Sequence, residues 1–441
     1  MIKTRNHDGA SLTTSPEAHV EHITLNGNGR STNALFNGED ARIGVVTQES
    51  DVPNYEVSSP KVLLITGGTV AVNGCLHQPG EIFTMPIGIV HLQTGSEKLE
   101  YISRKASPEI LQDTENRLLE LEKLGIGAAD WWNLSRNEQL ARLKIVIGHT
   151  DMEKVTLPSG QQILVKKESD NPSGSHYDRV YLKTIEHLET IGFLQPGDEL
   201  RDITSGSAGT SLALLSYLLG YSARITVPAE LPANRIYPML RFGAKVIDSG
   251  AGYVPHASEL QVTEIMALRA DNQWTEARPA DRSSRAFSFS NHEQRICYLN
   301  HSENDLSPQA FETIADEIGE QAPDTTHLLL AEGNWTTIAG ISPRIRQLLP
   351  RVQVIGYQGE VTNNTTDNFG TNVPNVPLRF KNVDLVDAEC IVTNIERDAA
   401  SKAAPQLGRS SLMGLALAQR IIRDHPAAHV VTIAYDQAER Y

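Results

Sequence analysis

From about residue 146 to the end of the chain, strand-like and helix-like patterns alternate. The strand-like segments lie at residues 163–165, 199–203, 224–227, 327–331, 352–355 and 430–434, and the last three are apolar. Amphipathic helical patterns lie between them, for example over residues 180–191 and 210–219. Strands that alternate with helices in this way form parallel sheets covered by helices. The sequence therefore predicts an α/β fold over residues 146–441, divided into two lobes around a cleft.

The preceding part of the chain has a different pattern. Residues 40–105 contain short β-like runs at 62–65, 69–72, 82–85 and 99–102, punctuated by glycine and proline. Asn73-Gly74 lies between two of these runs and is a strong signal for a hairpin turn. This pattern predicts a small β-barrel or sandwich. Residues 1–39 are rich in Asn, Gly, Ser and Thr, and we expect them to be loosely ordered.

Residues 106–145 carry helical signals and are predicted to be a helical linker. Ser107-Pro108 supplies a capping residue followed by proline, which favours the first position of a helix. Ser135, with Glu138 three residues later, has the spacing of a capping box before a second helix.

Composition narrows the class of protein. The chain has 441 residues and a net charge of −15, so we expect neither nucleic acid nor an anionic membrane as a partner, because both need a basic surface. Its three cysteines are widely spaced, which fits a reducing compartment better than a disulfide framework. The N-terminus lacks the apolar core of a secretory signal, and no apolar run reaches the length of a membrane span. These features predict a cytoplasmic protein.

Two glycine-rich turns each follow a predicted strand and open a predicted helix. They are Thr204–Thr210 and Gly333–Gly340. Ligands of open parallel sheets bind at the carboxyl ends of the strands, where such turns direct backbone N–H groups at an anion. Either turn alone would fit simple helix capping equally well.

The order of the motifs adds a family resemblance. The run Asn171–Arg179 is similar to Asn-Pro-Ser/Thr-Gly-Ser-x-Lys-Asp-Arg, which carries the cofactor lysine in fold-type II pyridoxal-phosphate (PLP) enzymes. Further segments resemble that family in the same order, at residues 147–150, 163–179, 204–210, 231–247, 333–340, 408–411 and 431–441. The resemblance implies the two-lobed fold of cysteine synthase and of the β-subunit of tryptophan synthase, and it implies a homodimer.

The resemblance also implies roles for individual residues. The loop expected to grip the carboxylate of an amino-acid-like substrate comprises Thr204, Ser205, Gly206, Ser207, Ala208, Gly209 and Thr210. Cys297 and Asn300 lie near further substrate contacts of the family. The cofactor-phosphate loop corresponds to Gly333, Asn334, Trp335, Thr336 and Thr337, and Ser411 corresponds to the serine that faces the pyridine nitrogen.

Three departures from the family pattern fall on cofactor contacts. Tyr177 stands where the family has its Schiff-base lysine, and a phenol cannot form an imine. Ser207 replaces an asparagine, while Trp335 and Thr336 replace glycines that let a phosphate approach closely. An indole there is expected to crowd a phosphate unless it turns away. These changes predict that the chain uses no cofactor. The alternatives are PLP bound noncovalently, or a displaced lysine at Lys166 or Lys167.

Tyr177 has two interpretations. With an unperturbed pKa near 10, a tyrosine near neutral pH donates a hydrogen bond or a proton, and here it would act with the Ser175 and Ser207 hydroxyls. Alternatively it fills the space of a lost cofactor. His176 and Asp178 flank it, but in an extended segment alternate side chains point in opposite directions.

The N-terminal strands have a motif of their own. Residues 80–91 resemble the second cupin motif, Gly-x5-Pro-x-Gly-x2-His, which ends here at His91. No His-x-His precedes it between residues 36 and 80, and a single imidazole rarely holds a metal. We therefore predict a metal-free cupin-like barrel over residues 40–105 that serves in docking, dimerisation or covering the cleft, with His91 as a weak metal candidate.

Three functions are compatible with these patterns. The first is a specialised-metabolism enzyme that performs a lyase, condensation or cyclisation step on an amino-acid-like substrate without Schiff-base chemistry. The second is a non-catalytic pseudoenzyme that binds an amino-acid ligand or supports a partner enzyme. The third is a PLP-dependent lyase or synthase with a noncovalent cofactor.

Overall fold

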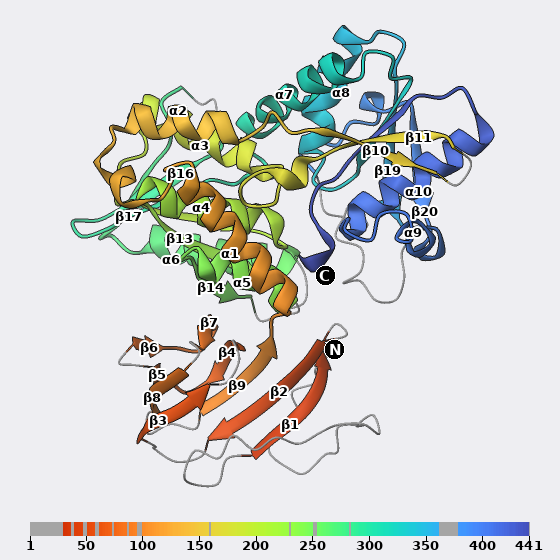
Figure 1. The fold of residues 1–441 in the computed structure, drawn as a ribbon. Helices are drawn as coiled ribbons and strands as arrows, with labels where there is room; N and C mark the ends of the chain where they lie inside the picture. Colours follow the sequence, from red (N-terminus) through yellow and green to blue (C-terminus); the bar gives the residue numbers. More distant parts are fainter. Residues whose placement is uncertain are drawn as a thin grey trace. The chain divides into compact units, whose positions relative to one another are not determined.

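The computed structural model describes residues 30–36, 39–46, 51–57, 61–72, 75–85, 88–94, 99–157, 160–228, 231–249, 254–281, 284–360 and 378–440 (Figure 1). The chain divides into two compact units, residues 1–105 and residues 106–441. The boundary falls at the end of strand β9 (Leu99–Lys105), where the β-like pattern of the sequence gives way to the helical one.

The first unit contains two antiparallel sheets. One has the strand order β1 (Arg30–Phe36), β2 (Glu39–Val46), β9, β4 (Lys61–Gly67) and β7 (Glu81–Met85). The other has the order β3 (Asp51–Val57), β8 (Gly88–Thr94), β5 (Val70–Val72) and β6 (Cys75–His77). Val70 and Val72 of the second sheet pack in one core with Leu63 and Phe83 of the first. The two sheets therefore share one hydrophobic core.

Strand β1 begins at Arg30, inside the segment 1–39 that we expected to be loosely ordered. The predicted turn at Asn73-Gly74 lies outside the described residues, although the strands on either side of it, β5 and β6, do pair as an antiparallel hairpin. A closed cupin-like barrel stays a prediction.

The second unit contains two mostly parallel sheets, as the alternating pattern predicts. The first has the order β14 (Lys245–Asp248), β13 (Ser222–Val227), β12 (Glu199–Ile203), β17 (Arg295–Tyr298), β16 (Phe287–Ser290) and β15 (Thr275–Ala277). The second has the order β10 (Met152–Thr156), β11 (Gln162–Lys166), β21 (Val430–Ile433), β18 (His327–Ala331), β19 (Gln353–Gly359) and β20 (Ala388–Val392). Only β15, β16 and β10 pair antiparallel within these described sheets.

Helices follow the parallel strands along the chain (Figure 1). They are α1 (Pro108–Lys123), α2 (Arg136–Val146), α3 (Tyr177–Thr190), α4 (Ser207–Leu219), α5 (Ala233–Arg241), α6 (Val254–Ala270), α7 (Leu306–Gln321), α8 (Thr336–Leu348), α9 (Asn394–Ala400) and α10 (Arg409–Asp424). The predicted caps are confirmed: the Ser107 side chain accepts from the N–H of Ile110, and Ser135 forms a capping box with Glu138. Helix α4 thus begins directly after β12, and α8 directly after β18.

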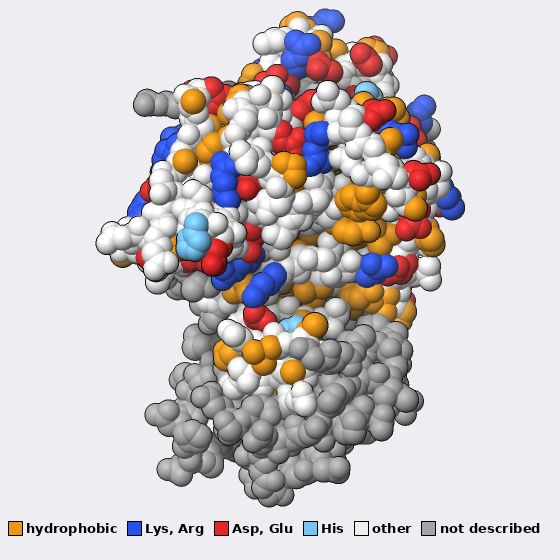
Figure 2. All heavy atoms as spheres, turned by 90° about the vertical axis from the view of Figure 1, so that its left-hand side faces the viewer, with side chains coloured by type: hydrophobic (Ala, Val, Ile, Leu, Met, Phe, Trp, Pro, Cys, Tyr) orange, Lys and Arg blue, Asp and Glu red, His pale blue; other side chains and the backbone are white. Residues whose placement is uncertain are grey.

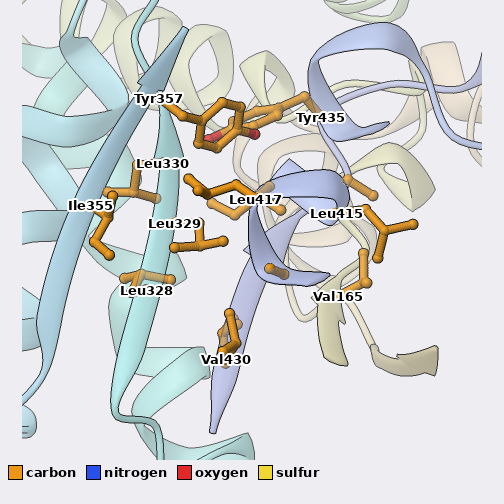
Figure 3. Packing of buried hydrophobic residues seen from close by; sticks show 14 of the residues in the cluster. Val165, Leu328, Leu329, Leu330, Ile355, Tyr357, Leu415, Leu417, Val430 and Tyr435 are labelled. Carbon is orange, nitrogen blue, oxygen red and sulfur yellow. The ribbon is translucent and has the colours of Figure 1, made fainter. Parts of the chain in front are cut away.

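The core of the second sheet surrounds the strand β18. Leu328, Leu329 and Leu330 are fully buried, and α10 covers the sheet with residues such as Leu417 (Figure 3). Tyr357 lies together with Tyr435 at one end of this cluster. Helices α7 and α8 lie so close together that a Cβ on Gly340 would be 2.1 Å from the carbonyl oxygen of Pro308. The ends of β18 and β21 are therefore fixed by packing on both sides.

The surface of the second unit carries both signs of charge. On the face drawn in Figure 2, Lys and Arg side chains lie among Asp and Glu side chains, with apolar side chains between them. Among the described residues, no helix is long and apolar enough to cross a lipid bilayer.

A buried ion-pair network holds the start of α3. The Arg179 guanidinium contacts the Glu168 carboxylate through Nη2–Oε1 at 2.7 Å and Nε–Oε2 at 2.8 Å, and it reaches Glu317 of α7 at 2.6 Å. Lys166 of β11 contacts the same Glu317 at 2.6 Å. Separating these partners would leave charges buried without compensation, which costs free energy. The network therefore holds the elements that carry it in their relative positions.

We predict that Arg179→Met lowers the free energy of unfolding by about 3–5 kcal/mol, because it leaves Glu168 and Glu317 buried without their partner. Urea denaturation measures the change. The matched control is Arg344→Met, which breaks the more exposed ion pair between α8 and Asp316 of α7 and should cost about 1 kcal/mol or less. Equal losses in the two variants would contradict the assignment.

The network also predicts an acid-dependent loss of stability. Burial alone would raise the pKa of Glu317, but hydrogen bonds and attraction from Arg179 and Lys166 lower that pKa from 4.5 to about 2. A depressed carboxyl pKa stabilises the fold above pH 4.5, and this stabilisation is lost as pH falls from 4.5 towards 2. Glu317→Gln should therefore flatten the dependence of the melting temperature on pH in this window. Glu320→Gln, on the exposed face of α7, should leave it unchanged.

Candidate functional site

Tyr177 is the first residue of α3, and the preceding His176 already has helical backbone angles. The expectation that neighbours here point in opposite directions is therefore wrong, because the segment is not extended. The rings of His176 and Tyr177 lie 4.2 Å apart. The half-buried phenol accepts a hydrogen bond from Asn334 Nδ2 at 3.3 Å. Burial raises the pKa of Tyr177 to about 12, so the phenol stays protonated and can donate its proton in a hydrogen bond.

Ser175 supports the start of the helix. Its side chain is fully buried, and its Oγ accepts a hydrogen bond from the backbone N–H of Tyr177 at 3.2 Å. Close packing constrains the preceding residue, because a Cβ on Gly174 would lie 2.7 Å from Arg440 Nη2. Ser175 thus acts in this structure as a cap that orients Tyr177.

The first glycine-rich turn, Thr204–Thr210, joins β12 to α4. Gly206 has φ 141°, which L-residues rarely adopt, and its N–H donates to Thr204 Oγ1 at 3.0 Å. Gly209 has no room for a side chain, because a Cβ would lie 2.6 Å from Thr204 Cγ2. The turn therefore places the positive N-terminal end of a 13-residue helix at the carboxyl end of the sheet, where an anion is stabilised.

Side chains behind this turn are held by polar contacts. Ser207 Oγ donates to Asp436 Oδ2 at 3.3 Å, and Arg235 Nη1 donates to the carbonyl oxygen of Ser205 at 2.8 Å. Thr210 Oγ1 accepts from Arg440 Nη1 at 3.2 Å, and Ala208 is buried in the first turn of α4. The Ser207 hydroxyl, predicted to orient substrate, is thus already engaged with a carboxylate.

The second glycine-rich turn, Gly333–Thr337, joins β18 to α8. Trp335 keeps a left-handed backbone, φ 65°, which is the conformation that glycine takes at no cost. Its indole does not crowd the loop, since it is buried in the core of the second sheet with 1% of its surface exposed. A Cβ on Gly333 would meet nothing within 4 Å. The loop therefore keeps open space in front of its backbone despite the tryptophan.

The polar groups of this turn face the start of α3. Asn334 Oδ1 accepts from Thr336 Oγ1 at 2.6 Å and from the Thr336 N–H at 3.1 Å, while its Nδ2 donates to Tyr177. Thr337 Oγ1 lies 3.5 Å from His176 Nε2. The predicted phosphate loop and the residue at the lysine position thus meet directly.

Ser411 is fully buried in the first turn of α10. Its Oγ accepts a hydrogen bond from the N–H of Tyr435 at 2.9 Å. A hydroxyl that accepts one bond still has its own proton to donate. Tyr435 in turn packs against the His176 ring at 5.1 Å. Ser411 is therefore connected through Tyr435 to the same group of residues as Tyr177.

Cys297 and Asn300 lie differently from the turn residues. Cys297 is buried in β17, and its Sγ faces Asp198 at 3.6 Å, with burial raising the pKa of the thiol well above its ordinary value. Asn300 Nδ2 donates to the carbonyl oxygen of Arg285 at 3.1 Å. The structure shows neither side chain bonded to the turn Thr204–Thr210. The neighbouring His301, which sequence analysis did not single out, packs edge-on against Tyr177 instead.

The lysines considered as substitutes are already engaged. Lys166 Nζ is fully buried, and it donates to the carbonyl oxygen of Thr150 and forms its ion pair with Glu317. Lys167 pairs with Glu153 at 3.1 Å and with Asp170 at 3.5 Å. Neither ammonium is directed at Tyr177.

No group of three or more metal-ligating side chains occurs within the described residues. The weak metal candidate His91 belongs to β8, and its side chain lies outside what the structure describes.

The fold and the site together define a class: a two-sheet α/β unit in which two glycine-rich turns each follow a parallel strand and open a helix. The family of pyridoxal-phosphate dependent enzymes matches residues 143–381, more than half of the chain. The chain belongs to this family.

Relatives and solved structures agree with that placement. The chain is 28% identical to cysteine synthase B of Salmonella typhimurium over 315 residues, which is 68% of this chain and 93% of that protein. It is 28% identical to rabbit (Oryctolagus cuniculus) cystathionine beta-synthase over 201 residues, 45% of this chain and 33% of that protein. The structure of O-ureido-L-serine synthase is similar with a TM-score of 0.56 at 21% identity, covering 68% of this chain and 92% of that one.

Family membership corrects one prediction. We expected no cofactor, and that expectation is wrong, because the family that matches this chain is pyridoxal-phosphate dependent. The residues present fit most of that group: Gly333 leaves open space before the N-terminus of α8, Thr336 and Thr337 supply hydroxyls, and Ser411 retains a proton to donate to a ring nitrogen. A covalent link needs an amine, and at Tyr177, which we predict to correspond to the family's lysine, the chain has a phenol instead.

Glu332 is a buried acid that sequence analysis missed. It is 2% exposed at the end of β18, and among the described residues neither carboxylate oxygen has a hydrogen-bond partner. A Cβ on Gly356 would lie 2.4 Å from its Oε1. Burial and the charge of Glu389 raise the pKa of Glu332 from 4.5 to about 7, although Lys381 opposes the shift.

We predict that Glu332→Gln raises the melting temperature at pH 8 but not at pH 4.5. A carboxyl with a raised pKa costs increasing stability as pH rises from 4.5 to 7, because the folded state resists losing the proton. Thermal unfolding over this pH range measures the difference. In Lys381→Met, which removes the opposing positive charge, the ionised Glu332 carboxylate should cost still more stability at pH 8. A melting-temperature difference that is the same at both pH values would contradict the prediction.

Proposed function

We propose that this protein is an enzyme of amino-acid metabolism that binds pyridoxal phosphate reversibly and without a covalent bond to the chain. The observation that carries the proposal is the contact between Tyr177 and Asn334. It places a phenol, which forms no imine, directly against the loop that corresponds to the family's phosphate site.

Particular groups would hold the cofactor. The N-terminal end of α8 and the Thr336 and Thr337 hydroxyls would bind its phosphate, and Ser411 would donate to its ring nitrogen. When bound, the cofactor supplies an electron sink for reactions at the α-carbon of an amino acid. The turn Thr204–Thr210 would bind the substrate carboxylate through the N-terminus of α4. Tyr177, whose pKa is raised to about 12, would orient the bound molecules as a hydrogen-bond donor.

The substrate class follows from the names of the relatives. Two solved structures are those of O-ureido-L-serine synthase and of an O-acetylserine dependent cystathionine beta-synthase from Helicobacter pylori. Both names contain a serine whose hydroxyl carries a substituent. We therefore propose an O-substituted L-serine as the amino-acid substrate, in a lyase or condensation step. A homodimer, a cytoplasmic location and a docking role for residues 40–105 remain part of the proposal.

A binding experiment tests the cofactor. Purified protein is titrated with pyridoxal phosphate, dialysed, and in a parallel sample treated with borohydride before peptide mass spectrometry. We expect saturable binding, complete release on dialysis, and no cofactor attached to any lysine. Thr337→Val should weaken binding by removing a hydroxyl from the phosphate loop, while Thr156→Val, at an exposed position of β10, serves as the matched control.

The outcomes separate the candidate functions. A lysine that carries the cofactor in full yield would contradict the noncovalent assignment. Binding of O-acetyl-L-serine without any binding of pyridoxal phosphate would support the pseudoenzyme instead.

Replacing Tyr177 by lysine should restore the covalent link. We predict that Tyr177→Lys acquires a cofactor adduct at residue 177 that borohydride fixes and that dialysis no longer removes, because an amine then lies beside Asn334. Tyr217→Lys, at an exposed position of α4, is the matched control and should acquire none. An unmodified residue 177 in a variant that still binds the cofactor would contradict the proposed placement.

A further inference from the structure

Asp202 is a buried acceptor at the carboxyl end of β12. It is 4% exposed, and its Oδ2 accepts hydrogen bonds from Tyr181 Oη and from the N–H of His301, each at 3.0 Å. Its Oδ1 accepts from the N–H of Ile203 at 2.8 Å. The same Oδ2 lies 3.2 Å from His301 Nδ1. This carboxylate therefore contacts both the backbone and the ring of one histidine.

A strained turn brings His301 to this place. Asn300 has φ 51°, a left-handed conformation that costs a non-glycine residue energy and persists only where surrounding contacts hold it. Three contacts do so: Asn300 Nδ2 donates to the Arg285 carbonyl oxygen, Asn304 Nδ2 to that of Leu299, and Ser307 Oγ to that of His301. Such strain is typical of residues that a site requires in one position.

The ring of His301 faces the residue at the lysine position. Its centroid lies 5.2 Å from that of Tyr177, with the rings at 87°. Tyr181 lies on its other side at 6.0 Å, and His176 packs against the far side of Tyr177. The titratable groups around His301 are thus Tyr177, Tyr181, His176 and Asp202.

The two ring nitrogens of His301 differ. Nδ1 is buried beside Asp202. The angle between the two groups departs from ideal hydrogen-bond geometry, as is common in sites without bound substrate. Nε2 has no hydrogen-bond partner among the described residues and is not buried in the way that Nδ1 is. A carboxylate at Nδ1 favours the tautomer with the proton on Nδ1, which leaves the lone pair on Nε2.

We propose that His301 is the proton-transfer residue of this site and that Asp202 is its positioning residue. The proposal rests on the proposed function. Nε2 accepts the proton from the α-carbon of the amino-acid substrate beside Tyr177, so that the Cα–H bond breaks and an N–H bond forms. It later returns the proton to the substrate. The electron pair of the broken bond stays on the substrate, and nothing is oxidised. A histidine would thus supply the base that a phenol, protonated at neutral pH, does not.

The first test needs no cofactor. In protein labelled with 15N at its histidines, we expect the ring-nitrogen shifts of His301 to show the proton on Nδ1. His301→Gln assigns the signal, and Asp202→Asn should shift the tautomer towards Nε2. A wild-type ring with its proton on Nε2 would overturn the proposal, whether or not either variant folds.

The second test measures the proton transfer. Protein with pyridoxal phosphate is incubated with O-acetyl-L-serine in deuterated water, and deuterium at the α-carbon is followed by NMR. His301→Gln should slow exchange by about 100-fold or more, with cofactor affinity unchanged within about threefold. His292→Gln, in the exposed turn between β16 and β17, is the matched control and should exchange like the wild type.

The outcomes distinguish the two proposals. Exchange in His301→Gln at the wild-type rate would overturn the role of His301 and leave the proposed function standing. Absence of both cofactor binding and exchange in the wild type would contradict the proposed function, and the tautomer measurement would then decide by itself whether Asp202 positions His301.

Discussion

The positions of the site residues depend on the ion pairs that the buried guanidinium of Arg179 forms. It joins Glu168, which follows β11, to Glu317 of α7, and it is itself in the first turn of α3. Tyr177 lies two residues earlier, so its direction is set by this network. Arginine suits the role because its planar fork contacts both carboxylates at once. The residue that we predict to stand in place of the family's lysine is thus held by this network.

Within that frame, the two sheets contribute to the site in different ways. The first sheet brings the turn before α4 and, through β12, the buried Asp202 with His301. The second brings Asn334, in the turn before α8, and Ser411, in the first turn of α10. Tyr177 stands between the two sets and contacts both, one through a hydrogen bond and one through a ring edge.

Sequence patterns predicted the fold well and the site partly. The strands β12 and β18 occur at their predicted residues, and each lies directly before a glycine-rich turn that opens a helix. Trp335 could not be placed from sequence, since whether an indole faces a ligand or a core depends on the packing beneath it. His301 escaped notice because its place depends on the left-handed backbone of Asn300, which no periodic pattern signals. Local patterns encode the elements, whereas these side-chain directions arise from tertiary contacts.

Trp335 has a consequence for how such a loop can change over time. Its left-handed backbone costs roughly 1–2 kcal/mol, so a change to glycine would relieve strain in the loop. The same change would remove a fully buried indole from the core, and emptying such a space costs about 3–5 kcal/mol. A single substitution of Trp335 by glycine would therefore lower stability. Compensating changes in the surrounding core would have to come first before the loop could accept glycine.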